Sequence, residues 1–511
     1  MVTELGNLAG EGPSRRLGTG IAGLDDILGG GFPARRLYLV HGDPGAGKTT
    51  LSMQFLLEGV RQGERSLYVT LSETREEIAD IARSHAWSLD GLNILEVSAE
   101  ATADEAETTV FHPSELELGQ RMRSLLAEVD RIRPTRLVLD SCSELRLLAQ
   151  SPLRYRRQIL AFKERLTRLG CTILLLDNPA PSSPDMLLQS VAHGVVAMEQ
   201  LSPLYGAERR RLRIVKLRGL KYRGGYHDCI IRTGGVQVFP RLVAAEHHRG
   251  FTREPVSSGV AELDALLGGG PDRGTSLLLM GPSGSGKSAV GTQFALAAAA
   301  RGERTVVIAL DESAAIYRAR AESLGMDVRT HLDAGRLSLQ QVDPAELSPG
   351  ELTHRIRQTV EGEKANLVVF DSLNGYLNAM PEESFVALQL HELLSYLGQR
   401  GVLTLMTVAQ HGLVGGEAAA PIDLSYLADS VLLFRYFEAH GQVRKAITAV
   451  KKRSGRHEST IRELLLGDDG VRVGPVLERF QGVLSGTPEY LGGDGREGAL
   501  LEGEHGRCPE S

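Results

Sequence analysis

Gly42-Asp43-Pro44-Gly45-Ala46-Gly47-Lys48-Thr49 has a second version in the same chain, Gly281-Pro282-Ser283-Gly284-Ser285-Gly286-Lys287-Ser288. Both read G-x-x-x-x-G-K-[ST], the phosphate-binding loop (P-loop) of nucleotide-binding proteins. Glycines let the backbone curl so that several N–H groups point at one anion, and the following helix adds its positive end. Each loop follows an apolar run, Leu37–Val40 or Leu277–Met280, as this strand–loop–helix motif requires. We therefore predict two ATP sites, each extended by one residue, Thr50 or Ala289.

Further residue types are expected around the phosphates. The lysine of each loop places a point charge near the outer phosphates, and the hydroxyl after it suits a magnesium ion that enters with ATP. An aspartate ends a later apolar run in each half, and such a side chain faces the phosphate edge of a parallel sheet. The expected magnesium ligands are Thr49, Asp140, Ser288 and Asp371.

The two halves repeat each other beyond the loops. Lys48 and Lys287 lie 239 residues apart, and Glu73 and Glu312 keep the same separation. Other matched blocks follow in the same order with slightly different separations, such as Asp140-Ser141 with Asp371-Ser372. Accidental matches would not keep both order and spacing, so the sequence indicates a duplicated domain.

Each half alternates short apolar runs with helical patterns, which predicts an α/β fold of two tandem P-loop domains. A mostly parallel sheet flanked by helices is expected in each, and β-hairpins should close it, Leu212–Leu217 with Cys229–Arg232 and Ala446–Val450 with Thr460–Leu465. The predicted boundaries are residues 14–240 and 256–485 for the domains, 241–255 for a linker and 486–511 for a disordered tail.

The bulk composition excludes several classes. With 57 Lys and Arg against 64 Asp and Glu, the net charge of −7 gives no basic field for nucleic acid. The apolar run Phe294–Ala300 is far shorter than the roughly 20 residues of a membrane span. The N-terminus has no export-signal pattern, and the four cysteines form no close pair. A cytoplasmic protein without a membrane partner is expected.

A carboxylate is needed to orient an attacking water or hydroxyl. The second apolar run of each half ends in Ser72-Glu73 or Asp311-Glu312. Glu73 and Glu312 are the candidate catalytic bases, with Asp311 as a further candidate in the second half. A solvated loop glutamate is the alternative.

Basic residues come late in each half and are expected to reach the γ-phosphate of a neighbouring subunit: Lys216, Arg218, Lys451 and Arg453. A solvated basic face is one alternative. Nucleic acid is the other, because Arg209, Arg210 and Arg211 open a basic stretch that Tyr205, Tyr222 and Tyr226 interleave. The acidic net charge argues against nucleic acid as a partner.

Together these residues resemble the KaiC family of RecA-like ATPases. The resemblance is carried by Thr19-Gly20-Ile21-Ala22-Gly23-Leu24-Asp25 before the first loop and by Ser258-Gly259-Val260-Ala261-Glu262-Leu263-Asp264 before the second. A Leu-Gly-Gly-Gly stretch follows each, and the Asp-Ser strand ends and late basic residues add to it. The likeness covers roughly residues 14 to 485.

The resemblance implies a homohexamer with ATP between subunits, a slow ATPase in the first domain and a serine/threonine autokinase in the second. Ser425 falls on the first of the family's two adjacent phosphosites, and Tyr426 replaces the threonine of the second. Signalling partners are not indicated by any motif. An ATP-driven DNA-binding protein of the RecA or DnaB class and a nucleotide-gated signalling scaffold remain the alternatives.

Overall fold

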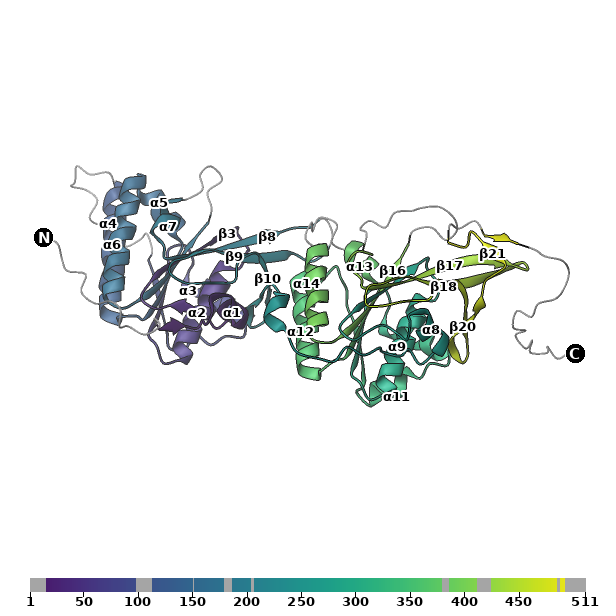
Figure 1. The fold of residues 1–511 in the computed structure, drawn as a ribbon. Coiled ribbons are helices and arrows are strands. Elements are labelled where there is room, and N and C mark those ends of the chain that lie inside the picture. Colours follow the sequence, from purple (N-terminus) through teal and green to yellow (C-terminus); the bar gives the residue numbers. More distant parts are fainter. Residues whose placement is uncertain are drawn as a thin grey trace, which may run out of the picture. The chain divides into compact units, whose positions relative to one another are not determined.

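The structure, a computed structural model, describes residues 15–97, 113–149, 151–178, 186–203, 206–378, 386–410, 424–484 and 488–491. The chain forms two compact units, and each contains a nine-stranded sheet (Figure 1). The units are described separately below.

The first sheet has the strand order β11-β10-β9-β8-β3-β7-β6-β4-β5. Strands β8, β3, β7, β6, β4 and β5 run parallel, and β9, β10 and β11 continue the sheet antiparallel. In sheet order, the bounds are β11 (Gly235–Phe239), β10 (His227–Arg232), β9 (Arg209–Leu217), β8 (Gly194–Leu201), β3 (Leu37–Gly42), β7 (Thr172–Asp177), β6 (Arg136–Asp140), β4 (Ser66–Thr70) and β5 (Leu92–Glu96).

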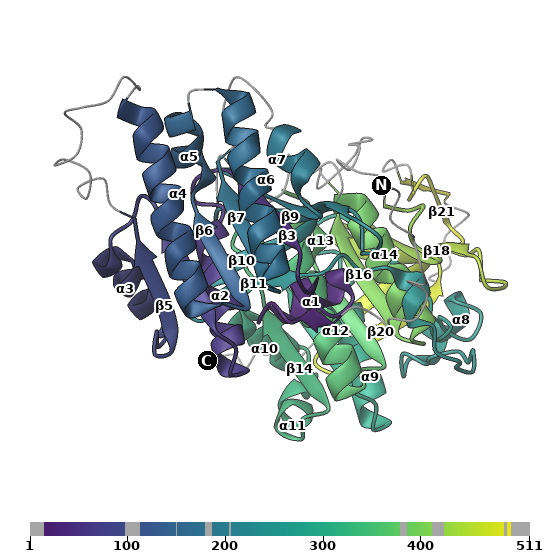
Figure 2. The same cartoon turned by 90° about the vertical axis from the view of Figure 1, so that its left-hand side faces the viewer.

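Helices cover both faces of this sheet, because its strands are apolar on both sides. Tyr68, Val138 and Leu174 point to one face and belong to the core cluster that contains residues of α1 (Ala22–Leu28) and α2 (Lys48–Arg61). The adjacent Leu67, Leu137 and Leu175 point to the other face, as the period of two requires. Figures 1 and 2 show the helices of that second face side by side: α4 (Pro113–Ile132), α5 (Cys142–Ala149) and α6 (Pro152–Arg168), with α7 (Met186–Val191) beyond α6.

The second sheet repeats the first strand for strand, in the order β14-β13-β15-β16-β12-β17-β18-β19-β20. Its first six strands are parallel and its last three antiparallel. In sheet order, the bounds are β14 (Leu337–Gln341), β13 (Thr305–Ala309), β15 (Leu367–Asp371), β16 (Leu403–Ala409), β12 (Ser276–Gly281), β17 (Ser430–Ala439), β18 (Gln442–Lys452), β19 (Arg462–Gly467) and β20 (Gly470–Val476). The predicted fold class is confirmed, and the predicted hairpins are β9–β10 and β18–β19.

One core cluster of the second unit lies between its sheet and α8 (Ala261–Leu266), α9 (Lys287–Ala300), α10 (Ala314–Ser323) and α11 (Val328–Asp333). The remaining helices of the second half of the chain are α12 (Pro349–Glu363), α13 (Leu373–Asn378) and α14 (Val386–Gln399), and α13 contacts β16. Among the described residues, no helix has the length and apolar content that crossing a membrane requires.

Short strands lie outside the two large sheets. Strand β1 (Arg16–Leu17) pairs with β2 (Phe32–Pro33), and β21 (Phe480–Gln481) pairs with β22 (Glu489–Tyr490). The second pair includes residues 489 and 490 of the segment 486–511 for which a disordered tail is predicted, and the Tyr490 and Phe480 ring centroids lie 5.4 Å apart. The rest of that predicted tail lies outside the described residues.

The sequence blocks before the P-loops have the same structural role in both units. The Asp25 carboxylate accepts a hydrogen bond from the Thr19 backbone N–H at 2.8 Å, and Asp264 accepts one from Ser258 at 2.7 Å. Each aspartate thereby closes the turn that leads into α1 or α8. This shared local geometry accompanies the repeated strand order.

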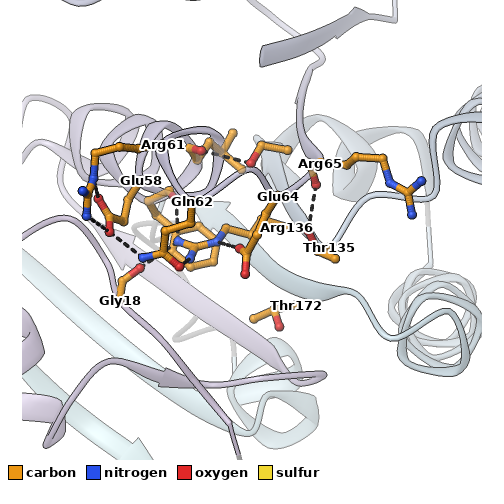
Figure 3. A network of polar contacts seen from close by, with 12 residues as sticks. Gly18, Glu58, Arg61, Gln62, Glu64, Arg65, Thr135, Arg136 and Thr172 are labelled. Atoms are coloured by element: carbon orange, nitrogen blue, oxygen red, sulfur yellow. Dashed lines mark hydrogen bonds and ion pairs between the residues drawn. The ribbon is translucent and has the colours of Figure 1, made fainter. Parts of the chain in front are cut away.

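One buried arginine has no counterpart in the second unit. Arg136, on β6, is fully buried and donates to Glu64 at 2.6 Å and to the carbonyl oxygens of Gly18 and Phe55 at 2.7 and 2.8 Å (Figure 3). It also lies over the Phe55 ring, 4.6 Å from the centroid. The network ties β6 to α2 and to the segment before α1, and Leu367 occupies the repeated position on β15.

Candidate nucleotide sites

Each P-loop connects a central strand to a helix. The first runs from β3 to α2 and the second from β12 to α9, so the motifs have the strand–loop–helix context predicted for them. Gly47 and Gly286 adopt φ angles of 98° and 104° at the helix N-caps, a conformation that side chains other than glycine disfavour. These turns aim the first backbone N–H groups of α2 and α9 into the loop, where an anion fits.

The side-chain ammonium groups of the two loop lysines donate hydrogen bonds to backbone carbonyl oxygens of their own loops. Lys48 Nζ donates to the Gly42 and Asp43 carbonyl oxygens at 2.7 and 2.8 Å, and Lys287 Nζ donates to Gly281 and Pro282 at 2.8 and 2.6 Å. Within the described part of the chain, neither lysine forms an ion pair with a carboxylate. Burial lowers the pKa of Lys48, and it lowers the pKa of Lys287 to about 8. A bound phosphate would offset this cost of burying the positive charge.

Asp140 gathers two hydroxyl groups in the first site. Thr49 Oγ1 donates to its carboxylate at 2.8 Å and the Tyr68 hydroxyl donates at 2.7 Å. Thr49 is the second residue of α2, Tyr68 lies on β4 and Asp140 ends β6, so three elements meet at one carboxylate. Two of the predicted magnesium ligands are therefore in direct contact.

Asp371 also accepts hydrogen bonds from two hydroxyl groups in the second site, but one of the donors comes from a different strand. Ser288 Oγ donates to Asp371 Oδ1 at 2.9 Å, and Thr407 Oγ1, from β16, donates at 2.6 Å. Within the described residues, no group of three or more His, Cys, Asp or Glu side chains is arranged to hold a metal. A hydroxyl beside one carboxylate fits magnesium that takes its other ligands from phosphates and water.

Glu73 lies just beyond the end of β4, where its backbone N–H donates to Thr70 Oγ1 at 2.8 Å. Its Oε2 atom is buried and has no hydrogen-bond partner among the described residues. Burial, with the negative charges of Asp140 and Glu77, raises the pKa of Glu73 to about 7. A carboxyl group in this state can take up a proton near neutral pH, as a general base must.

The candidate bases of the second site are placed differently. Glu312 forms an ion pair with Arg320 of α10, and the same guanidinium lies 3.6 Å from Asp371 Oδ2. Asp311 accepts a hydrogen bond from the Ser372 hydroxyl. The two halves thus have the same strand order but different partners for their carboxylates.

The late basic residues bind backbone carbonyls of their own unit. In the first half, Lys216 Nζ donates to Gln189 at 2.6 Å and Arg218 donates to Ser190 at 2.8 Å. In the second half, Lys451 Nζ donates to the carbonyl oxygens of Ser425 and Ala428, both at 2.7 Å. Arg453 donates to the Tyr426 carbonyl at 2.8 Å. The structure thus brings Lys451 and Arg453 to the segment that carries Ser425, which is half-buried in a turn.

The basic stretch around β9 is largely paired within the unit. Arg211 forms an ion pair with Glu199 at 2.8 Å, and Arg211 and Arg213 lie over the Tyr226 ring at 4.1 and 5.0 Å. Arg223 pairs with Asp26 at 2.9 Å. Tyr205 lies outside the described residues.

Several contacts at the sites were not anticipated from the sequence. The hydroxyl groups of Tyr68 and Thr407 donate to the two aspartates, and Arg320 pairs with Glu312 in the second site. In the P-loops, Arg210 donates to the Gly45 carbonyl at 3.0 Å and Tyr436 donates to the Ser283 carbonyl at 2.9 Å. Comparing the repeats position by position could have found Arg320, because the first half has Ile81 there. No motif marks the others.

Comparisons with known proteins agree with this geometry. The family model described as "ATPase: KaiC" matches residues 17–243 and again residues 256–478. The circadian clock protein KaiC3 of Synechocystis sp. is 27% identical over 487 residues, which cover 93% of this chain and 95% of that protein. The circadian clock oscillator protein KaiC of Synechococcus elongatus is 28% identical over 514 residues, with 97% and 96% covered. The protein of that name from Thermostichus vulcanus is 27% identical over 492 residues, with 94% and 93% covered.

Proposed function

This chain belongs to the KaiC family of ATPases, and on that basis we propose that it binds ATP with magnesium in both halves, hydrolyses ATP, and phosphorylates its own Ser425. The observation that carries the proposal is the doubled arrangement of a loop lysine, half-buried at Lys48 and buried at Lys287, with a hydroxyl on an aspartate, Thr49 on Asp140 and Ser288 on Asp371. Magnesium, when bound, supplies positive charge to the phosphates during transfer.

Glu73 is proposed as the base for hydrolysis in the first half. Water attacks the γ-phosphorus, the bond to the ADP oxygen breaks, and the carboxylate takes the proton of the water. The unpartnered, buried Oε2 atom of Glu73 and its raised pKa support this role. Lys48 stays beside the phosphates and stabilises the charge that develops on them.

The kinase proposal concerns the turn at Ser425. Lys451 and Arg453 hold the carbonyl groups of this turn, so a basic pair and a hydroxyl occupy one surface segment. If the basic pair reaches the phosphates of a neighbouring chain in a homohexamer, the Ser425 hydroxyl approaches the same γ-phosphate. Glu312 or Asp311 of that neighbour would take the hydroxyl proton as the Ser425 oxygen bonds to the γ-phosphorus, and the bond from the γ-phosphorus to the ADP oxygen breaks, so that ADP leaves.

Nucleotide stoichiometry tests the two-site proposal. We expect two ATP molecules per chain in the wild type, and one in Lys48→Ala and in Lys287→Ala, because each substitution removes one loop charge. Lys221→Ala, at an exposed lysine outside the loops, is the matched control and should keep two. Unchanged stoichiometry and affinity in either loop variant would contradict the proposal. Released phosphate, measured with and without DNA, separates hydrolysis from a scaffold and from a DNA-stimulated motor.

Mass spectrometry after incubation with ATP tests the phosphosite. We expect phosphate on Ser425 in the wild type and none in Lys287→Ala, since transfer draws on the second site. Ser425→Ala should lose the phosphate and keep hydrolysis in the first half. Phosphate on Tyr426 alone, or on Ser425 unchanged in Lys287→Ala, would contradict the assignment.

A further inference from the structure

The helices that follow the second strand occupy repeated positions, but they carry different residues toward the phosphate edge. Helix α3 (Arg75–Ser84) and α10 start and end 239 residues apart. Ile81 of α3 and Arg320 of α10 occupy equivalent positions of the repeat, 239 residues apart. The Arg320 guanidinium pairs with Glu312, lies 3.6 Å from Asp371 Oδ2 and is supported by the Tyr317 ring at 4.9 Å. A positive charge is thus built into the pair Glu312 and Asp371 of the second site, and Ile81 at the repeated position supplies none to the first.

The other carboxylate of the second site is also held. Besides the Ser372 hydroxyl, Asp311 has Gly375 of α13 beside it, and a Cβ atom at that glycine would lie 2.0 Å from Asp311 Oδ1. The first half has Ser72 and Glu144 at the repeated positions. The first half thus has a small residue followed by an acidic one at these two positions, and the second half has an acidic residue followed by glycine. The packing of Asp311 depends on that glycine, because a larger residue at position 375 would overlap its carboxylate.

Arg320 and magnesium compete for one carboxylate. Both are cations near Asp371, and they repel each other most strongly where solvent is partly excluded. The exposed side-chain fractions are 25% for Arg320 and 8% for Asp371, so screening by water is incomplete. The ion pair also holds the Glu312 carboxylate in place, whereas Oε2 of Glu73 has no hydrogen-bond partner among the described residues.

We propose that Arg320 is a positioning residue that restrains the second site: it holds Glu312 and weakens magnesium binding at Asp371, so the second half retains its ATP longer than the first. The proposal rests on the proposed function, in which both halves bind ATP. Its chemical consequence is a division of labour between a faster hydrolytic site and a slower site whose ATP remains available for transfer.

Magnesium titration tests the restraint without requiring turnover. In the full chain, binding of a fluorescent ATP analogue should show two magnesium midpoints, and Lys287→Ala should remove the higher one. Arg320→Ile, which installs the residue of the first half, should lower that midpoint about tenfold, because one charge no longer opposes the ion. Arg320→Lys should keep most of the restraint. Arg318→Ile, an exposed arginine on the same helix, is the matched control and should change neither midpoint.

Turnover gives the second readout. In a Glu73→Gln background, which silences the first half while leaving its loop intact, Arg320→Ile should raise phosphate release about tenfold, equivalent to about 1.4 kcal/mol in the barrier. Adding Glu312→Gln should cancel the gain, because the freed carboxylate is the group that acts.

Two outcomes would overturn the inference. An unchanged higher midpoint in Arg320→Ile means that the arginine does not oppose magnesium, and lower turnover in that variant means that it assists the phosphates directly. Neither outcome touches the proposed function, which fails instead if the analogue binds at neither P-loop.

Discussion

At the scale of single residues, the two sites use different side chains to donate hydrogen bonds to the aspartate that ends the equivalent strand. Asp140 and Asp371 each accept two hydroxyl hydrogen bonds, but the second donor is Tyr68 from β4 in the first half and Thr407 from β16 in the second. The strand order is the same, so the substitution moves the donor to the other neighbouring strand without moving the aspartate. Duplicated domains can therefore keep a site while its supporting residues diverge.

Another residue of this scale makes stability depend on pH. His227 on β10 is buried; its Nδ1 accepts from the Arg241 backbone N–H at 2.8 Å and its Nε2 contacts the Arg223 carbonyl at 3.0 Å. Burial, with the nearby Arg241 and Arg223 charges, lowers its pKa from 6.5 to about 4. The folded state therefore binds fewer protons than the unfolded state between these values, and the neutral ring stabilises the fold only above them.

We expect this stabilisation to be complete above pH 6.5 and to fall by about 2 kcal/mol by pH 5, at 1.36 kcal/mol per pH unit. Urea unfolding of the first unit, followed from pH 7.5 to 5, measures it. His227→Gln lacks the titrating ring, so it should be less stable at pH 7.5 and lose less on acidification. Parallel pH profiles for the two proteins would show that His227 does not contribute.

At the scale of elements, the Arg136 network joins β6, α2 and the segment before α1 (Figure 3). The second unit places Leu367 at the repeated position, so the fold itself does not require an arginine there. Removing one partner of a buried ion pair leaves the other charge uncompensated, which is more costly than replacing the whole pair by apolar groups.

Arg136→Leu should therefore lower the unfolding free energy of the first unit by about 3 kcal/mol, because the buried Glu64 carboxylate keeps, among the described residues, only its ion pair with the exposed Arg15. The Gly18 and Phe55 carbonyls also lose their donor. Adding Glu64→Gln should recover part of the loss, since it removes a buried charge that Arg136 no longer balances. Urea unfolding with a probe in each unit measures both effects, and the second unit should be unaffected. A double variant that is less stable than the single one would contradict this account.

At the scale of the whole molecule, the proposed hexamer makes assembly depend on nucleotide. A ligand that binds only the assembled state shifts association by mass action. Light scattering should show a larger particle with a non-hydrolysable ATP analogue than without nucleotide. Replacing Lys216 and Arg218 together should weaken that response while leaving the P-loops intact. A monomer under both conditions would contradict the assignment of these residues to a neighbour's phosphates.

Much of this architecture could be predicted from local patterns. The P-loops, the strand-end aspartates and the duplication follow from motifs at fixed spacing, and continuous apolar runs mark the buried strands. The edge strands β5 and β14 could not be found in this way, because Leu92–Glu96 and Leu337–Gln341 mix polar and apolar residues without a clear period. An edge strand has a neighbour on one side only, which relaxes the demand for apolar residues.

Side-chain partners were harder to predict than elements. Arg320 reaches Glu312 from the far end of a helix, and Thr407 reaches Asp371 from a strand 36 residues further along the chain. Such contacts depend on how elements pack in three dimensions, and sequence spacing does not encode that. The proposed functional difference between the halves therefore rests on residues that no motif selects.

The central position of the P-loop strands has a consequence for motion. Strand β3 is hydrogen-bonded to β7 on one side and β8 on the other, and β12 is held in the same way by β16 and β17. A central strand is released only when one of its neighbours also opens, whereas β5, β11, β14 and β20 can fray alone. Amide hydrogens of β3 and β12 should consequently exchange with solvent more slowly than those at the sheet edges. In any rearrangement driven by nucleotide, we therefore expect the central strands that lead into the P-loops to stay in place and the edge strands of each sheet to move.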